Sequence, residues 1–169
     1  MLSARTDRVH ARGAGVEAGT PSSEEYWRHG RLARLVTDGR TVTTGPAGSR
    51  VAVRGRRVET GPPLRDWLGW TDRLLQPERL HVWGRPGEDW RLGAVEGWSP
   101  GVPGCVVVSL DHVQDGRRGE AHVDPRTGRV LLLDLPGVVR WQLTGVDDDP
   151  DVASWPQHRW FTAVRESGA

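Results

Sequence analysis

The sequence predicts an α+β fold, in which an antiparallel β-sheet of hairpins and a meander carries one central and one C-terminal helix packed on one face. Two observations lead to this fold class. Short runs that alternate apolar and polar residues, separated by Gly- and Pro-rich turns, fill most of the chain and are typical of strands. Between residues 62 and 77 the apolar period instead becomes about 3.6 residues, which indicates a helix.

The N-terminal part carries almost no large apolar side chain as far as residue 21, so it cannot offset the entropy that is lost on ordering. We therefore predict a disordered leader over residues 1–21 and a single α+β domain over residues 22–169. Ser22 and Glu25 have capping-box spacing, which predicts a short helix at the start of this domain. Gly30 would end that helix.

The first hairpin is predicted by the Asp38-Gly39 pair, which stands between two β-prone runs. A two-residue turn at this pair places Leu35 opposite Val42. Further short strands are expected after it, as far as Val58.

The central helix is predicted from an apolar stripe that starts after Pro62 and Pro63 and ends at Pro77. We favour packing against the sheet, because the main helix of a single domain has to cover it. The alternative is a partner-binding helix that uses two of its tryptophans. The stripe consists of Leu64, Trp67, Leu68, Thr71, Leu74 and Leu75, and the second tryptophan is Trp70.

The C-terminal half predicts a hairpin, a meander and a closing helix. The hairpin joins residues 80–84 to 90–98, and the meander strands are 105–113, 119–124, 129–135 and 138–144. Ser154 and Gln157 repeat the capping-box spacing, so we expect the closing helix to run through Trp160 and Val164.

The first two meander strands provide a candidate catalytic group. Strand alternation places Ser109, Asp111 and His122 on one polar face, and one of two allowed registers puts Asp111 directly opposite His122. A serine, a histidine and a carboxylate are the parts of a hydrolytic triad. Solvated sheet faces carry the same residue types, and no Gly-x-Ser-x-Gly motif surrounds Ser109, so an ordinary surface is the favoured interpretation.

Metal binding is the second candidate chemistry. His122 and Asp124 lie two residues apart on one strand face, and His158 would complete a two-histidine, one-carboxylate Fe(II) site of the kind found in metal-dependent oxygenases. His-x-Asp spacings also occur often by chance. We therefore expect no cofactor and keep the metal site as an alternative.

The tryptophans predict a binding surface. Nine Trp in 169 residues exceed what one small core needs, so some are expected at the surface, where Trp is enriched in binding hot spots. Trp83, Trp90 and Trp98 fall in one predicted hairpin and its exit. We predict that these three residues form a surface for a protein partner.

Composition and charge limit the classes of function that the protein can have. All 23 basic residues are Arg, while Lys, Ile and Asn are absent, which indicates a GC-rich bacterial genome. Without Lys, the protein cannot use a P-loop lysine or form a Schiff base through lysine. Residues 1–57 hold 11 Arg and 5 acidic residues, a net charge of +6, so nucleic-acid binding by this part is an alternative. Cys105 is the only cysteine. With neither a signal-peptide pattern nor a membrane-span pattern in the sequence, we expect a cytoplasmic protein.

One segment has a family resemblance. Residues 107–133 contain an Asp-Gly turn and then Glu-Ala-His-Val-Asp-Pro-Arg-Thr-Gly-Arg-Val. The segment resembles the strand pair of PepSY-type modules and of several bacterial immunity-protein families, in which an Asp-x-x-Thr-Gly turn joins two strands. It covers under a fifth of the chain, and the resemblance implies a hairpin at this place.

These patterns predict a soluble binding or interaction protein more readily than an enzyme. The specific version is an inhibitor- or immunity-type protein with a protein partner. Two alternatives stay open: a small enzyme or metal-dependent oxygenase centred on His122 and Asp124, and a nucleic-acid-binding protein that uses its Arg-rich N-terminal part.

Overall fold

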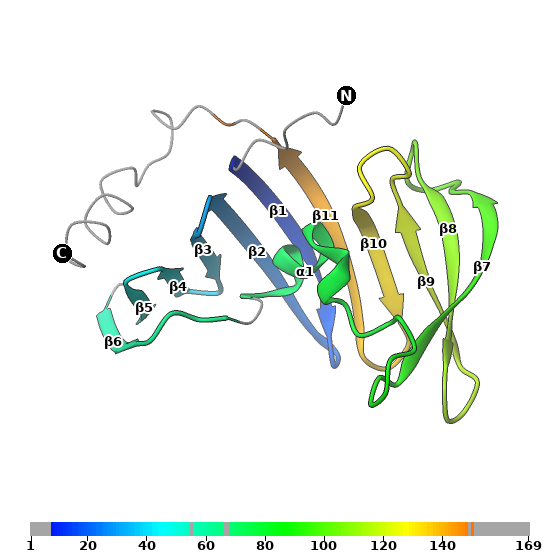
Figure 1. Cartoon of the computed structure of the whole chain (residues 1–169), viewed down its shortest axis with the longest axis horizontal. Coiled ribbons are helices and arrows are strands. Elements are labelled where there is room, and N and C mark those ends of the chain that lie inside the picture. Colours follow the sequence, from blue (N-terminus) through cyan, green and yellow to red (C-terminus); the bar gives the residue numbers. More distant parts are fainter. Residues whose placement is uncertain (1–7, 55, 66–67, 149, 151–169) are drawn as a thin grey trace. The chain divides into compact units, whose positions relative to one another are not determined.

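The computed structural model describes residues 8–54, 56–65, 68–148 and 150, and this part of the chain is dominated by antiparallel β-strands. Eleven strands form one sheet in the order β6-β5-β4-β3-β2-β1-β11-β10-β9-β8-β7 (Figure 1). Apart from β1 and β11, sheet neighbours are also neighbours in sequence, so nearly every connection is a simple hairpin or meander turn. The two terminal strands of the sheet are β6 and β7.

The strand boundaries follow the turn residues closely. The strands are β1 (Arg8–Glu17), β2 (Thr20–His29), β3 (Leu32–Thr37), β4 (Arg40–Gly45), β5 (Gly48–Val53), β6 (Arg56–Gly61), β7 (Trp90–Trp98), β8 (Val106–His112), β9 (Arg118–Val123), β10 (Val130–Leu135) and β11 (Val139–Asp147). The Asp38-Gly39 turn has positive φ at both residues, and Leu35 pairs with Val42 as predicted.

The predicted α+β class is wrong, because the described part of the chain is a β-rich fold with a single short α-helix. This helix, α1 (Trp70–Leu75), has six residues and is followed by the 3₁₀-helix η1 (Pro77–Arg79). Among the described residues that precede it, 64–65 and 68–69 are not helical. The backbone N–H of Leu64 donates to the Thr44 hydroxyl at 2.8 Å, and the Leu64 side chain is exposed, so the periodic stripe does not form one buried face. The predicted C-terminal helix lies outside the described residues.

The start of the chain also differs from the prediction. The leader predicted over residues 1–21 contains all of β1, and the helix predicted from Ser22 is part of β2. Ala18 and Gly19, with φ of +47° and +83°, make the tight turn between these strands. A strand can be held by backbone pairing with its neighbours and needs only small apolar residues at alternate positions, so the lack of large side chains did not prevent order.

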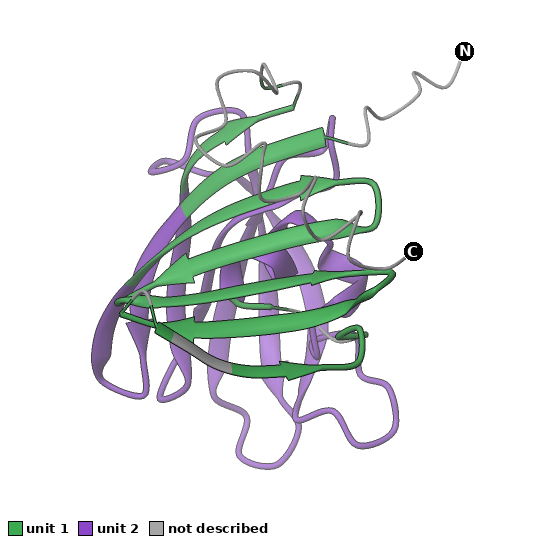
Figure 2. Ribbon diagram, turned by 90° about the vertical axis from the view of Figure 1, so that its left-hand side faces the viewer, with its two compact units in different colours: residues 1–12, 23–69, 144–169 green, residues 13–22, 70–143 purple. Residues whose placement is uncertain are grey.

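Two compact units divide the chain (Figure 2). Unit 1 consists of Met1–Arg12, Ser23–Gly69 and Thr144–Ala169. One face of its sheet buries Val9, Ala11, Tyr26, Leu35 and Val42. On the other face, Trp27 stacks on the ring of His10, with centroids 5.1 Å apart, and the Arg34 guanidinium lies 5.3 Å from the Trp27 ring centre. Burial lowers the pKa of Arg34, and nearby Glu25 partly opposes this shift.

Unit 2 consists of Gly13–Ser22 and Trp70–Leu143 and has its core beneath α1. The helix contacts β10 and buries all six of its residues. Trp141 of β11 is almost completely buried, and its indole N–H donates to the Thr71 hydroxyl at 3.3 Å. Gly13 lies so close to this pair that a Cβ there would meet both the hydroxyl and the indole nitrogen.

Burial decreases from this core towards β7. One cross-strand row joins Trp141, Leu133, Ala121, Val108 and Val95 over five neighbouring strands. The first three side chains are buried, Val108 is half-buried, and Val95 is 66% exposed. The end of the sheet at β7 is therefore left uncovered within unit 2.

Candidate functional site

The exposed terminal strand β7 carries three large apolar side chains. Every residue of β7 after Trp90 is exposed, and Leu92, Val95 and Trp98 are exposed by 42%, 66% and 72%. We call these three residues the β7 stripe. Isolated exposed apolar residues are normal, but a series of them along an unpaired edge strand is a template for association with another chain.

The β7 stripe lies on one face of the sheet because β7 is bulged. The stripe residues pair with Leu110, Val108 and Val106 of β8, which are two residues apart and therefore share a face. In a regular strand a spacing of three would place Leu92 and Val95 on opposite faces. Register shifts between Leu92 and Val95 and between Val95 and Gly97 bring all three side chains to the same side.

Ser109 holds the first of these bulges. Its hydroxyl accepts a hydrogen bond from the Ala94 N–H at 2.9 Å and donates to the Ala94 carbonyl at 3.1 Å. The opposing position is Gly93, where a Cβ would meet the Ser109 hydroxyl. Ser109 is buried and committed to these two bonds, so the structure places this predicted catalytic candidate in a supporting position within the strand pair.

The other face of β7 is charged. Arg91 pairs across the strands with Asp111, and Glu96 accepts a hydrogen bond from Arg118 at 3.2 Å. Arg118 also lies 3.8 Å from Asp111 and is its direct cross-strand partner. The predicted opposition of Asp111 and His122 is not formed, because the observed register differs from both registers that we considered. The division of side chains between the two faces is nevertheless the predicted one.

His122 belongs to a different network of polar contacts, which could not be predicted from the sequence. Its Nδ1 lies 2.7 Å from the Ser99 hydroxyl and its Nε2 lies 3.0 Å from a Glu120 carboxylate oxygen. The Glu120 carboxylate can only accept, so the Nε2–H of His122 donates to it, and the Ser99 oxygen also accepts the N–H of Val102 at 2.9 Å. These contacts connect the β7–β8 loop, which follows Trp98 directly, to strand β9. Ser99 was missed because it lies in a Pro- and Gly-rich turn with no motif around it.

Asp124 stabilises the turn between β9 and β10. Its carboxylate accepts hydrogen bonds from the Arg126 N–H and the Thr127 hydroxyl, both at 2.9 Å. Burial alone would raise the pKa of Asp124, but these bonds and the Arg126 charge together hold it below its ordinary value. Within the described ranges, no group of three or more His, Cys, Asp or Glu residues could hold a metal ion. His158 lies outside those ranges.

The three predicted surface tryptophans do not form one surface. Trp90 is 4% exposed and packs edge-on against His112, with ring centroids 5.0 Å apart. Trp98 stands at the other end of β7, roughly 26 Å away for an extended strand of this length. Trp83 lies near the Trp90 end, where its indole N–H donates to the Pro77 carbonyl at 3.0 Å. Trp98 is therefore the member of the three that remains in the candidate site.

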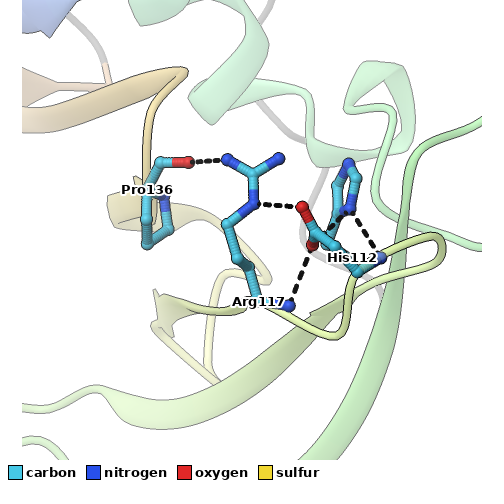
Figure 3. A network of polar contacts seen from close by, with 4 residues as sticks. His112, Arg117 and Pro136 are labelled. Atoms are coloured by element: carbon cyan, nitrogen blue, oxygen red, sulfur yellow. Dashed lines mark hydrogen bonds and ion pairs between the residues drawn. The ribbon is translucent and has the colours of Figure 1, made fainter.

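A polar network closes the sheet end that carries Trp90 (Figure 3). The Asp115 carboxylate contacts His112 Nδ1 at 2.7 Å and accepts the Arg117 side-chain Nε–H at 2.7 Å, while Arg117 also donates to the Pro136 carbonyl at 3.0 Å. The backbone N–H of Arg117 has the largest effect on the pKa of Asp115 and lowers it; desolvation opposes this shift, and the Arg117 side chain adds to it. This network joins the β8–β9 and β10–β11 turns.

The arginines of the N-terminal part are distributed over both sheet faces of unit 1. By register, Arg34 and Arg50 lie on one face, whereas Arg28 and Arg40 lie on the other. These four arginines do not form a single row of the kind that follows a phosphate backbone.

A cavity beside α1 is the main alternative site in unit 2. Its volume is about 220 Å³, and its lining includes Arg73, Trp90 and Leu133. Burial lowers the pKa of Arg73 to about 10, against the attraction of Glu17 and Asp72. The volume is below the roughly 300–1,000 Å³ of ordinary ligand pockets.

Comparisons with known proteins give a limited result. No family model and no curated protein matches the sequence. Two solved structures resemble the fold weakly: the crystal structure of MucB, and that of MucB in complex with MucA(peri). Both are 20% identical to this chain, with TM-scores of 0.39 and 0.42.

The matches cover 86% and 90% of this chain but only 55% and 53% of the MucB chains, so the chain spans about half of their length. A likeness of this size assigns neither a family nor a function. Separately, in the described part of the chain no helix has the length and apolar character that a membrane span requires.

Proposed function

We propose that this protein is a binding protein that docks an extended segment of a partner protein along β7. The observation that supports the proposal is the terminal strand itself, whose Leu92, Val95 and Trp98 side chains project from one face and are 42–72% exposed. Addition of a strand to an open sheet edge uses main-chain hydrogen bonds for affinity and alternate side chains for specificity.

The contrast with the other terminal strand supports the choice of β7. Strand β6 begins with Arg56, which is exposed, and charged residues on an edge discourage pairing with other chains. Strand β7 has its charges, Arg91 and Glu96, on one face only. A partner segment therefore meets apolar side chains on one side and a charged pair on the other.

Trp98 is expected to contribute most to the binding. A Trp side chain buries up to roughly 250 Å², so covering its exposed 72% removes about 180 Å² from water. At about 25 cal/mol per Å² this corresponds to about 4.5 kcal/mol before the cost of association is subtracted. Its removal should therefore weaken binding by about 2 kcal/mol or more, as for other Trp hot spots.

The experiment compares capture of host proteins by the wild type and by Val95→Asp and Trp98→Ala, with quantitative mass spectrometry. Val113→Asp is the matched control, because Val113 is 54% exposed in the same unit but lies outside β7. Partners that are lost from both β7 variants and kept by the control support the proposal. Equal capture by the wild type and both β7 variants contradicts it.

The inhibitor- or immunity-type role is the more specific form of the proposal. An inhibitor that occupies its target through β7 would suppress the activity of the captured partner. Adding purified wild type to that partner should lower its activity, and Val95→Asp should not. A partner that stays fully active when bound would contradict the inhibitor role.

A further inference from the structure

We propose that a second copy of this chain is an occupant of the β7 edge, so that two β7 strands pair antiparallel about a two-fold axis between Gly93 and Ala94. The inference rests on the proposed function, since it names one partner for the same edge. It follows from the order of residues along β7 and from the faces that the bulges give them.

The strand is self-complementary in this register. Antiparallel pairing about the 93–94 midpoint places Arg91 opposite Glu96 of the second copy and Leu92 opposite Val95 of the second copy. The two-fold axis repeats both pairs. Gly93 and Ala94 meet at the centre, where small side chains allow the two backbones to approach closely.

The bulge makes this register compatible with a continuous sheet. Cross-strand partners share a face of the sheet, so Leu92 of one copy lies on the same face as Val95 of the second copy. A two-fold axis perpendicular to the sheet keeps every residue on its face, so residues 92 and 95 of one copy must also share a face. A regular strand would place them on opposite faces. In β7 the register shift between Leu92 and Val95 puts both on the face of Leu110 and Val108, while Arg91 and Glu96 lie with Asp111 and Arg118 on the other.

The arrangement is also selective. A bulged, partly charged edge accepts only segments whose faces and charges match its own, which is how edges avoid indiscriminate association. A second copy has the matching bulge and the matching charges. Glu96, already 3.2 Å from Arg118 of its own chain, would then lie between two arginines, and two such groups would form in the pair.

Charge-reversal variants test the register directly. Arg91→Glu gives a strand with Glu at both 91 and 96, and Glu96→Arg gives one with Arg at both. Each variant alone brings like charges together twice in the proposed pair, which should weaken self-association by about tenfold or more. A one-to-one mixture of the two variants restores two opposite-charge pairs and should associate about as well as the wild type.

The measurement is sedimentation velocity over a range of concentrations, with circular dichroism to compare the fold of each variant. The expected result is a concentration-dependent wild-type dimer, weaker association of each single variant, and recovery in the mixture. Recovery in the mixture cannot be produced by misfolded variants. A wild type that stays monomeric up to about 1 mM, or a mixture that stays monomeric, overturns the inference.

The same variants separate this inference from the proposed function. If the wild type is monomeric but Val95→Asp still abolishes capture of another protein, self-pairing is refuted and the β7 docking edge stands. If Val95→Asp leaves both dimerisation and capture unchanged, both are refuted.

Discussion

Ser109→Ala is the perturbation that most directly tests how the β7 stripe is built. The Ser109 hydroxyl makes two hydrogen bonds to the backbone of Ala94 and is the side chain that holds the first bulge. A neutral hydrogen bond contributes about 1 kcal/mol, so the variant should lose about 2 kcal/mol of unfolding free energy. For a chain of this size that corresponds to a fall in Tm of roughly 4–8 °C.

The assay combines urea unfolding with amide hydrogen exchange. The exchange of the Ala94 amide should accelerate in Ser109→Ala, because its acceptor has been removed. Ser49→Ala is the control, since Ser49 is a half-buried strand serine whose hydroxyl has no hydrogen bond among the described residues. The reasoning is refuted if Ser109→Ala matches the control within about 0.5 kcal/mol and the Ala94 amide exchanges at the wild-type rate.

Three further predictions concern the core and the turns. Trp90→Ala should destabilise the protein by about 3–5 kcal/mol because Trp90 is buried, whereas Trp98→Ala should change stability by no more than about 0.5 kcal/mol; urea unfolding of both variants checks the contrast. The lowered pKa of Asp124 means that its stabilising contribution is complete above its unfolded pKa of about 3.9 and is lost as pH falls through the folded pKa. Asp124→Asn should therefore be less stable than wild type at pH 6, with a difference that shrinks below about pH 4; a constant difference in unfolding free energy across this range would refute the assignment. Gly13→Ala should destabilise by about 1–3 kcal/mol or more, because its Cβ meets the Trp141 indole, and a wild-type Tm would show that this contact relaxes freely.

The hairpins could be predicted because their signals are local. The Asp38-Gly39 turn fixed the pairing of Leu35 with Val42, since a two-residue turn leaves no freedom of register. The alternation of Ser109 and His122 onto one face was also predicted, because face depends only on parity.

The errors share a physical cause, which is that tertiary pairing overrides local propensity. Residues 8–17 are weak β-formers that become a strand by pairing with β2 across a tight turn and with β11, which is distant in sequence. The stripe from Leu64 to Leu75 has helical spacing, yet among its described residues the helix begins only at Trp70. A bulge is likewise invisible in the sequence, so the common face of Leu92, Val95 and Trp98 could not be predicted from their spacing of three.

The central claim is that β7 is the docking edge, and amide hydrogen exchange over residues 90–98 with and without a captured partner tests it most directly. The account predicts that binding slows exchange along β7, because its outward N–H groups acquire carbonyl partners. Val95→Asp should show no such protection at the same concentrations. Protection confined to other residues, with β7 exchanging equally in the free and bound protein, would contradict the claim.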